Sequence, residues 1–194
     1  GLSQGEVLEI TKNLDLNTSE EDYLKIIENK TAILFAAACQ IGGILGNISE
    51  ENQRALHDYG FNLGMAFQLT NILRDIGTDA AQGRIYLPQE DLHTFSCTED
   101  TILQRQETDA TRKLFHFEIA RAHEYYAKAQ AAFDALPASD RQALTVAEIM
   151  RAVYVRILKK LEEPRHRIFG PRARLATSRR LAVAAGVWFR SRST

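Results

Sequence analysis

The sequence is short of the residue types that mark several protein classes. Its 194 residues include only two cysteines, Cys39 and Cys97, which lie far apart and show no metal-ligand spacing. This argues against a disulfide framework or a zinc site and fits a reducing cytosol, so we expect a cytoplasmic protein. The net charge is −1, so the chain has no electrostatic bias toward nucleic acid, and we expect no such partner.

Long apolar runs and common catalytic motifs are also missing. The longest candidates for a membrane span, AILFAAACQIGGILG and LAVAAGVWF, are too short or too rich in glycine, and no signal peptide is visible. The five histidines show no ligand spacing. There is no Ser-His-Asp pattern, P-loop or G-x-G-x-x-G, so the common zinc, serine-hydrolase and nucleotide-binding patterns are absent.

Helix signals run through nearly the whole chain, while the alternating pattern of strands is scarce. Ser19 and Ser49 are each followed by two glutamates, which is typical of an N-cap with an acidic first turn. Gly60 and Gly64, four residues apart, predict a narrow helix face that another helix can approach closely. We predict one all-α domain of antiparallel helices over residues 1–194. The helices are expected over about 20–46, 50–80, 108–135, 141–162 and from about 176, with a loop at 82–98.

The second predicted helix carries an amide and two carboxylates at a strict four-residue step, as Asn71, Asp75 and Asp79. Each step offsets the side chain by only about 40° and raises it by about 6 Å, so the three groups share one stripe. Oxygen ligands suit Mg²⁺, which takes one or two carboxylates and completes its shell with water and substrate phosphates. Arg84 and Tyr86 follow the helix and would add cationic and phenolic contacts to phosphate oxygens. The stripe is therefore interpreted as one wall of a metal–diphosphate site, although a solvated helix face also shows such spacing by chance.

The stretch AFQLTNILRDIGTDAAQGRIYLPQEDL resembles the second aspartate-rich motif of the squalene/phytoene synthase family, and in particular that of bacterial presqualene diphosphate synthases. The C-terminal EIMRAVYVRILKKLEEPRHRIF and RLATSRRLAVAA are similar to the end of that group. The resemblance implies an isoprenoid synthase-type antiparallel helical bundle and a prenyltransferase that depends on Mg²⁺, or on Mn²⁺ in its place. Such an enzyme condenses two prenyl diphosphates of the farnesyl or geranylgeranyl type head to head and releases diphosphate.

The resemblance also assigns roles to residues of this motif. It implies that the stripe residues Asn71, Asp75 and Asp79 bind the metal and act in catalysis. Gln68, Arg84 and Tyr86 match substrate-pocket positions of the family. Thr78 departs from the pattern, because the family commonly has glutamate there, and this weakens the metal side of the site.

The first third resembles a different group. YLKIIENKTAILFAAACQIGGIL and DYGFNLGMAFQ, with GEVLEI before them, are similar to long-chain polyprenyl diphosphate synthases, which are head-to-tail enzymes. In those enzymes the pair that matches Lys30 and Thr31 contacts diphosphate, although a lysine in mid-helix is usually solvated. The slot for D-D-x-x-D reads N-I-L-R-D here, with Asn71 and Ile72 in place of two aspartates. The pattern therefore switches near residues 66–70, and a head-to-tail synthase is an alternative function that these two residues disfavour.

A second acidic cluster is missing from the front of the chain. Residues 1–66 contain no D-D-x-x-D or D-x-x-x-D, and the acidic runs SEEDY and SEEN are better explained as helix caps. Because both families use two facing clusters, we expect a chain truncated at its N-terminus. A catalytically silent helical fragment or chimera is the alternative, and a homodimer is a further expectation.

The C-terminal segment is strongly basic. From Pro164 onward the sequence has eight arginines and no Asp or Glu. Leu181, Val187, Trp188 and Phe189 alternate with these arginines, which predicts peripheral contact with an anionic membrane surface. The alternative is a terminal helix that closes the bundle and leaves its arginines in solvent.

Overall fold

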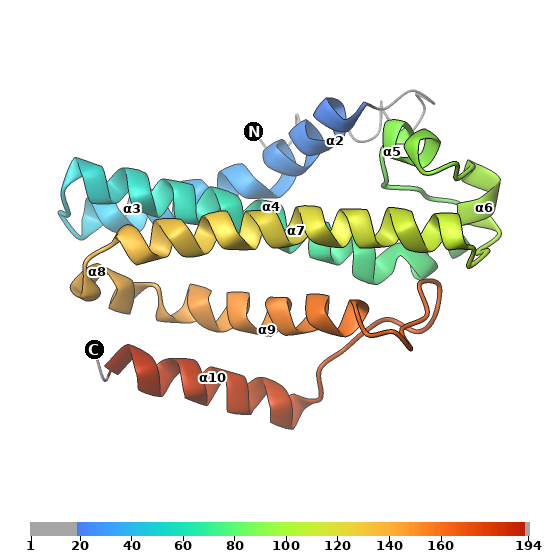
Figure 1. Ribbon diagram of the computed structural model, residues 1–194. Coiled ribbons are helices and arrows are strands. Elements are labelled where there is room, and N and C mark those ends of the chain that lie inside the picture. The colour runs from blue at the N-terminus through green and yellow to red at the C-terminus, as the bar shows by residue number, and fades with distance from the viewer. Residues whose placement is uncertain (1–18, 193–194) are drawn as a thin grey trace.

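The computed structural model describes residues 19–192, and every regular element in that range is helical. Figure 1 shows long helices packed side by side in a bundle, with shorter helices at its two ends. The predicted all-α antiparallel bundle is therefore confirmed, while GEVLEI lies outside the described residues. The elements are α2 (Glu20–Ile27), η1 (Glu28–Ala32), α3 (Ile33–Leu45), α4 (Glu50–Ala81), α5 (Gln89–Thr94), α6 (Glu99–Leu103), α7 (Asp109–Ala135), α8 (Ala138–Ala143), α9 (Thr145–Leu161) and α10 (Thr177–Arg192).

The predicted start signals work as helix caps. The hydroxyl oxygens of Ser19 and Ser49 accept hydrogen bonds from the backbone N–H groups of Asp22 and Asn52, at 3.1 and 3.3 Å. The acidic runs SEEDY and SEEN thus begin α2 and α4, as predicted. The helix expected over 20–46 is the unbroken run of α2, η1 and α3, in which η1 is a single π-helical turn.

Two sequence predictions about element bounds are wrong. The stretch 82–98 is not a loop throughout, because α5 forms inside it after Pro88, with Glu90 and Asp91 in its first turn. A helix of this length is not stable alone, so it depends on tertiary contacts, and both Asp91 and Leu92 are buried. The helix predicted from residue 141 begins at Thr145, and the short α8 precedes it.

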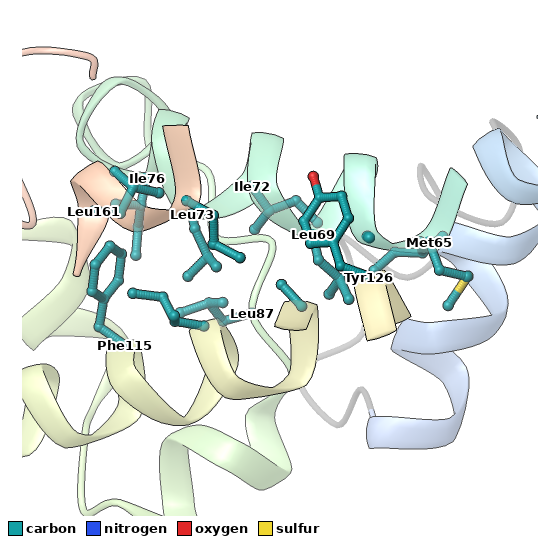
Figure 2. Close-up of a cluster of buried hydrophobic side chains, with 14 of the residues drawn as sticks. Met65, Leu69, Ile72, Leu73, Ile76, Leu87, Phe115, Tyr126 and Leu161 are labelled. Carbon is teal, nitrogen blue, oxygen red and sulfur yellow. The ribbon is translucent and has the colours of Figure 1, made fainter. Parts of the chain in front are cut away.

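Helix α4 is the centre of the bundle, since η1, α3, α7 and α9 all pack on it. Figure 2 shows part of its apolar face, from Met65 to Ile76, beside Phe115 and Tyr126 of α7 and Leu161 of α9. Leu69 is completely buried in this core. One helix therefore supplies both the main core face and the polar stripe.

Two glycines let η1 and α3 come very close to α4. A Cβ atom at Gly64 would lie 2.7 Å from the Cα of Ala32, and one at Gly60 would collide with the backbone of Phe35. At both glycines the added atom would therefore be closer to its neighbour than an ordinary van der Waals contact allows. The narrow face predicted from the four-residue glycine spacing is confirmed.

A buried arginine joins α2, α5 and α7. Arg121 is 7% exposed, and its Nη1 donates to Asp91 at 2.7 Å and to Glu118 at 2.8 Å. Its Nη2 lies 3.0 Å from a carboxylate oxygen of Glu20. Burial raises the pKa of the fully buried Glu118 to about 8, although the charge of Arg121 acts in the opposite direction. We therefore expect Glu118 to keep its proton at neutral pH.

We expect Gly64→Ala to destabilise the protein by about 1–3 kcal/mol, because the added methyl group forces η1 away from α4. Gly42→Ala is the matched control, since a Cβ there meets nothing within 4 Å and improves helix propensity by about 1 kcal/mol. Urea unfolding followed by circular dichroism measures both changes. Equal stabilities of the two variants would contradict the close approach.

We also expect Glu118 to lower the free energy of unfolding as pH rises from 4.5 to about 8. Unfolded Glu118 releases its proton near 4.5, while folded Glu118 retains it, so Glu118 contributes up to about 1.4 kcal/mol of lost stability per pH unit. Glu118→Gln, which stays neutral, should remove this part of the slope in urea unfolding at pH 5 and 7.5. Glu124→Gln, an exposed change on the same helix, should leave the slope unchanged. If Glu118→Gln also leaves the slope unchanged, Glu118 is ionised in the folded protein.

Candidate active site

The residues singled out in the sequence gather along one stripe of α4 and beside its two ends. The stripe covers about 16 Å at the helical rise per residue. η1 packs on α4 near the start of the stripe, and the chain leaves α4 at its other end through residues 82–88. In order along α4, the stripe residues are Gln68, Asn71, Asp75 and Asp79.

At the start of the stripe, two segments far apart in the sequence meet. The hydroxyl group of Thr31 on η1 donates to Oε1 of Gln68 at 3.2 Å. Lys30 is half-buried, and its charge partly opposes the rise that burial causes in the pKa of Asp79. This supports a lysine at the edge of the site over a freely solvated one. Both residues lie in a π-helical turn, an element that is rare and often found at functional sites.

Asn71 has an unsatisfied polar atom. Its Oδ1 is buried and has no hydrogen-bond partner among the described residues. A buried acceptor without a partner costs about 1–3 kcal/mol, so a bound ion, a water molecule or a ligand is the usual explanation for one. A metal ion or a hydrogen-bond donor would satisfy this oxygen, and Asn71 therefore fits the metal role that its spacing predicts.

Asp75 is held by two arginines. Arg74 donates to both carboxylate oxygens at 2.9 Å, and Arg172 lies 2.5 and 2.7 Å from the same two oxygens. Arg74 also donates to the hydroxyl group of Tyr154 at 3.3 Å. The carboxylate predicted to bind metal is therefore paired with cationic side chains in this structure.

Asp79, at the end of the stripe, lies among charges of both signs. Partial burial raises its pKa, and the negative charge of Asp75 acts in the same direction. Three cations oppose this rise, namely Arg84, Arg172 and Lys30. The two predicted diphosphate contacts Lys30 and Arg84 thus act on one carboxylate, although they come from opposite sides of it in the sequence.

The exit from α4 places the remaining predicted residues beside Asp79. The backbone N–H of Arg84 donates to the carbonyl oxygen of Asp79 at 2.9 Å. Tyr86 lines a cavity of about 10 Å³ together with Asp79 and Arg84, which holds at most one water molecule. Thr78, where the family commonly has glutamate, is exposed.

One acidic wall is present in the described part of the chain. Between residues 19 and 192, no three His, Cys, Asp or Glu side chains come together in a group that could hold a metal by themselves. Two carboxylates and an amide nevertheless suit Mg²⁺ whose other ligands are phosphate and water. The donor set therefore fits a metal that is shared with a diphosphate.

Sequence reasoning missed Arg172 and Tyr154 as neighbours of the stripe and left Arg74 without a role. Arg74 stands next to Asp75 in the sequence, so its pairing was within reach of a sequence argument. Arg172 lies 97 residues from Asp75 along the chain. Only the arginine-rich composition after Pro164 marks that region, and composition does not say which arginine returns to the site.

The sequence profile of the squalene/phytoene synthase family matches residues 36–181. The chain belongs to this family. A 15-cis-phytoene synthase of Synechocystis sp. is 39% identical over 129 residues, which cover 66% of this chain and 37% of that enzyme. The chain thus spans well under half the length of this curated relative, so the activity of a whole family member is a proposal for it.

Two solved structures are similar to the chain. A dehydrosqualene synthase superposes with a TM-score of 0.69 at 22% identity, over 92% of this chain and 59% of that one, which shows the shared fold. A polyprenyl synthase from Caulobacter crescentus, solved with calcium and isoprenyl diphosphate, is 32% identical with a TM-score of 0.57. The superposition covers 72% of this chain and 51% of that one.

These comparisons confirm the family, its class of enzyme and the isoprenoid synthase-type fold expected from the sequence. They also connect the chain with both kinds of synthase that its two parts resemble. The family profile begins at residue 36, inside the stretch that resembles polyprenyl synthases. The switch near residues 66–70 and the extent of the single domain over 1–194 stay predictions.

Proposed function

We propose that this chain holds a prenyl diphosphate through Mg²⁺ at the stripe of Asn71, Asp75 and Asp79, as part of a head-to-head prenyltransferase. The observation that carries this proposal is the buried, unpartnered Oδ1 of Asn71, one helical turn from Asp75. An orphaned oxygen beside carboxylates suits a hard cation, and Mn²⁺ would replace Mg²⁺ there. The calcium and isoprenyl diphosphate bound by the Caulobacter polyprenyl synthase support this choice of ligands.

The chain's own residues would position the diphosphate around this metal. Lys30 and Arg84 would neutralise its oxygens from two sides, while Gln68 and Thr31 would offer hydrogen bonds at one end and Tyr86 at the other. When bound, Mg²⁺ would neutralise charge on the leaving diphosphate and promote formation of an allylic cation.

A run of aromatic rings beside the stripe would hold the prenyl chain. The rings of Phe35 and Phe67 are 5.5 Å apart between centroids, and those of Phe67 and Tyr154 are 4.3 Å apart. All three side chains are half-buried, so the run offers an apolar surface next to Gln68 and Asn71. Aromatic faces also attract cations, which suits the charge that develops on the prenyl chain.

A catalytically silent chain is the second candidate. The observation that favours it is that, between residues 19 and 192, no three His, Cys, Asp or Glu side chains form a group that could hold a metal by themselves. Such a chain would still bind metal and diphosphate but would release no condensation product. Head-to-tail chain elongation is the third candidate, supported by the similarity to the polyprenyl synthase and opposed by Asn71 and Ile72 in the D-D-x-x-D slot.

We expect Asp75→Asn to abolish turnover of farnesyl or geranylgeranyl diphosphate and to weaken binding of inorganic diphosphate with Mg²⁺ by at least about tenfold. Product analysis and isothermal titration calorimetry measure the two effects, and circular dichroism should show unchanged helix content. Asp58→Asn is the matched control, because Asp58 is an exposed aspartate on the same helix.

The three candidates give different outcomes. Turnover that survives Asp75→Asn would contradict the proposed mechanism. Binding without any product in the unmodified chain would indicate the silent candidate. Product that forms only after addition of isopentenyl diphosphate would indicate the head-to-tail candidate.

We further propose that α10 contacts an anionic membrane surface. Val187 packs α10 onto the bundle, while Leu181 and Phe189 are 65% and 64% exposed and Trp188 is 40% exposed. Arg192 lies over the ring of Trp188, 4.1 Å from its centroid, so cationic and aromatic groups share this surface. No helix among residues 19–192 is long and apolar enough to cross a membrane. A cytoplasmic location and a homodimer stay predictions.

The single tryptophan of the chain, Trp188, reports on this contact. We expect its fluorescence to shift to shorter wavelength with vesicles of phosphatidylglycerol, and not with phosphatidylcholine, because attraction of arginine to anionic lipid is electrostatic. Added salt should reverse the shift. Phe189→Ser should weaken it, while Val146→Ser, an exposed apolar change on α9, should not; no shift with anionic vesicles would contradict the proposal.

A further inference from the structure

Four guanidinium nitrogen atoms lie within 2.9 Å of the carboxylate oxygens of Asp75. Arg74 donates from Nε and Nη2, while Arg172 donates from Nη2 and brings its Nε to 2.5 Å of the other oxygen. An ionised carboxylate offers about four lone-pair sites in all. Asp75 accepts three hydrogen bonds from these nitrogens and has the fourth in ion-pair contact, so a metal ion would have to compete with two guanidinium charges for its oxygens.

Neighbouring positions of the stripe thus differ in whether their oxygen atoms are available to a metal ion. Asn71 presents a buried oxygen without a partner among the described residues, whereas both carboxylate oxygens of Asp75 are paired with arginines. Like charges at such short distances repel strongly in a partly buried site. One of the two arginines has to leave before Asp75 becomes a metal ligand.

Arg172 is the arginine that is free to leave. The side chain of Arg74 is only 11% exposed, donates to the Tyr154 hydroxyl group and lies over its ring at 5.8 Å. The side chain of Arg172 is 41% exposed, and within the described chain its hydrogen-bonding partner is Asp75 alone. Arg172 leaves by breaking its ion pair with Asp75 and giving up its weaker attraction to Asp79, while Arg74 would also lose its contacts with Tyr154.

The backbone around Arg172 is fixed while its side chain has room to turn. Phe169 packs so tightly on α4 that a Cβ at Gly77 would lie 3.1 Å from its backbone. Lys160 donates from Nζ to the carbonyl oxygen of Arg174 at 3.1 Å. A groove of about 290 Å³ adjoins the side chain, and it is lined mainly by Arg74, Tyr154, Ile157, Arg174 and Arg180.

We propose that Arg172 keeps Asp75 closed to metal until a diphosphate arrives, and then exchanges the carboxylate for phosphate oxygens. This inference rests on the proposed function. A guanidinium group pairs with phosphate in the same forked geometry as with carboxylate, so a diphosphate beside the stripe offers Arg172 an equivalent partner. Asp75 is freed at the same moment. Metal and diphosphate consequently bind with positive coupling, and metal alone binds weakly.

The exchange predicts effects of opposite sign from one substitution. Arg172→Gln should raise the affinity for Mn²⁺ alone by about five- to tenfold, because Asp75 loses the competing cation. The same variant should lower the affinity for inorganic diphosphate at saturating Mg²⁺ by about tenfold, because a bidentate partner is lost. Electron paramagnetic resonance of free Mn²⁺ measures the first quantity, and isothermal titration calorimetry measures the second.

Two further variants make the experiment specific. Arg174→Gln removes a nearby exposed arginine that does not touch Asp75, and it should change neither affinity more than twofold. Arg172→Lys keeps the positive charge but loses the forked guanidinium group. Its affinities for Mn²⁺ and for diphosphate should therefore lie between those of the unmodified chain and those of Arg172→Gln. Thermal unfolding followed by circular dichroism confirms that each variant is folded.

The outcomes separate this inference from the proposed function. If Asp79→Asn weakens both ligands while Arg172→Gln weakens Mn²⁺ or leaves it unchanged, the exchange is wrong and the proposed site stands. If Asp79→Asn affects neither ligand, the proposed site is wrong and the exchange with it. Opposite signs in Arg172→Gln, absent from Arg174→Gln, support the exchange.

Discussion

The close approach of η1 and α3 to α4 is the constraint on which the candidate site depends. Helix axes come this near only where side chains are absent, and Gly60 and Gly64 supply that gap. The approach puts Thr31 within hydrogen-bond distance of Gln68 and brings Lys30 near enough to affect Asp79. With larger residues at the two glycines, the front of the chain would lie too far away to belong to the site.

The second constraint is that α4 serves two purposes. Its apolar face forms the core with α7 and α9 (Figure 2), and the stripe residues Asn71, Asp75 and Asp79 are themselves half-buried. Partial burial raises the pKa of Asp79, and cations from three parts of the chain oppose the rise. Asp75 is likewise compensated by positive charge, because it forms ion pairs with Arg74 and Arg172. Ion pairing with arginines stabilises the carboxylates of the stripe beside the core. These arginines are also the groups that a diphosphate would bind.

The ends of the site are held from a distance by Arg121. Its partner Asp91 lies in α5, which directly follows the exit segment with Arg84 and Tyr86, and its partner Glu20 lies in α2, which directly precedes η1. One buried guanidinium group therefore ties together the two segments that flank the stripe. Unlike Arg172, Arg121 is almost completely buried and has several partners, which suits a fixed structural role.

The sequence by itself determined the features that depend on local physics. The helix caps at Ser19 and Ser49, the glycine spacing in α4 and the placement of Asn71, Asp75 and Asp79 on one helix follow from propensity and helical periodicity, and the structure confirms them. The metal role of the stripe stays a prediction. The family resemblance also predicted Lys30, Thr31 and Gln68 as substrate contacts. In the structure, Thr31 and Gln68 are joined by a hydrogen bond.

Only the tertiary structure decided the features that depend on distant contacts. α5 forms because Asp91 and Leu92 are buried by other helices, which no local signal over residues 82–98 reveals. The pairing of Asp75 with Arg172 joins residues that are 97 positions apart, and many arginines of the tail would have satisfied the same pattern. Charge and periodicity specify which groups a helix presents, but the path of the chain decides which groups meet.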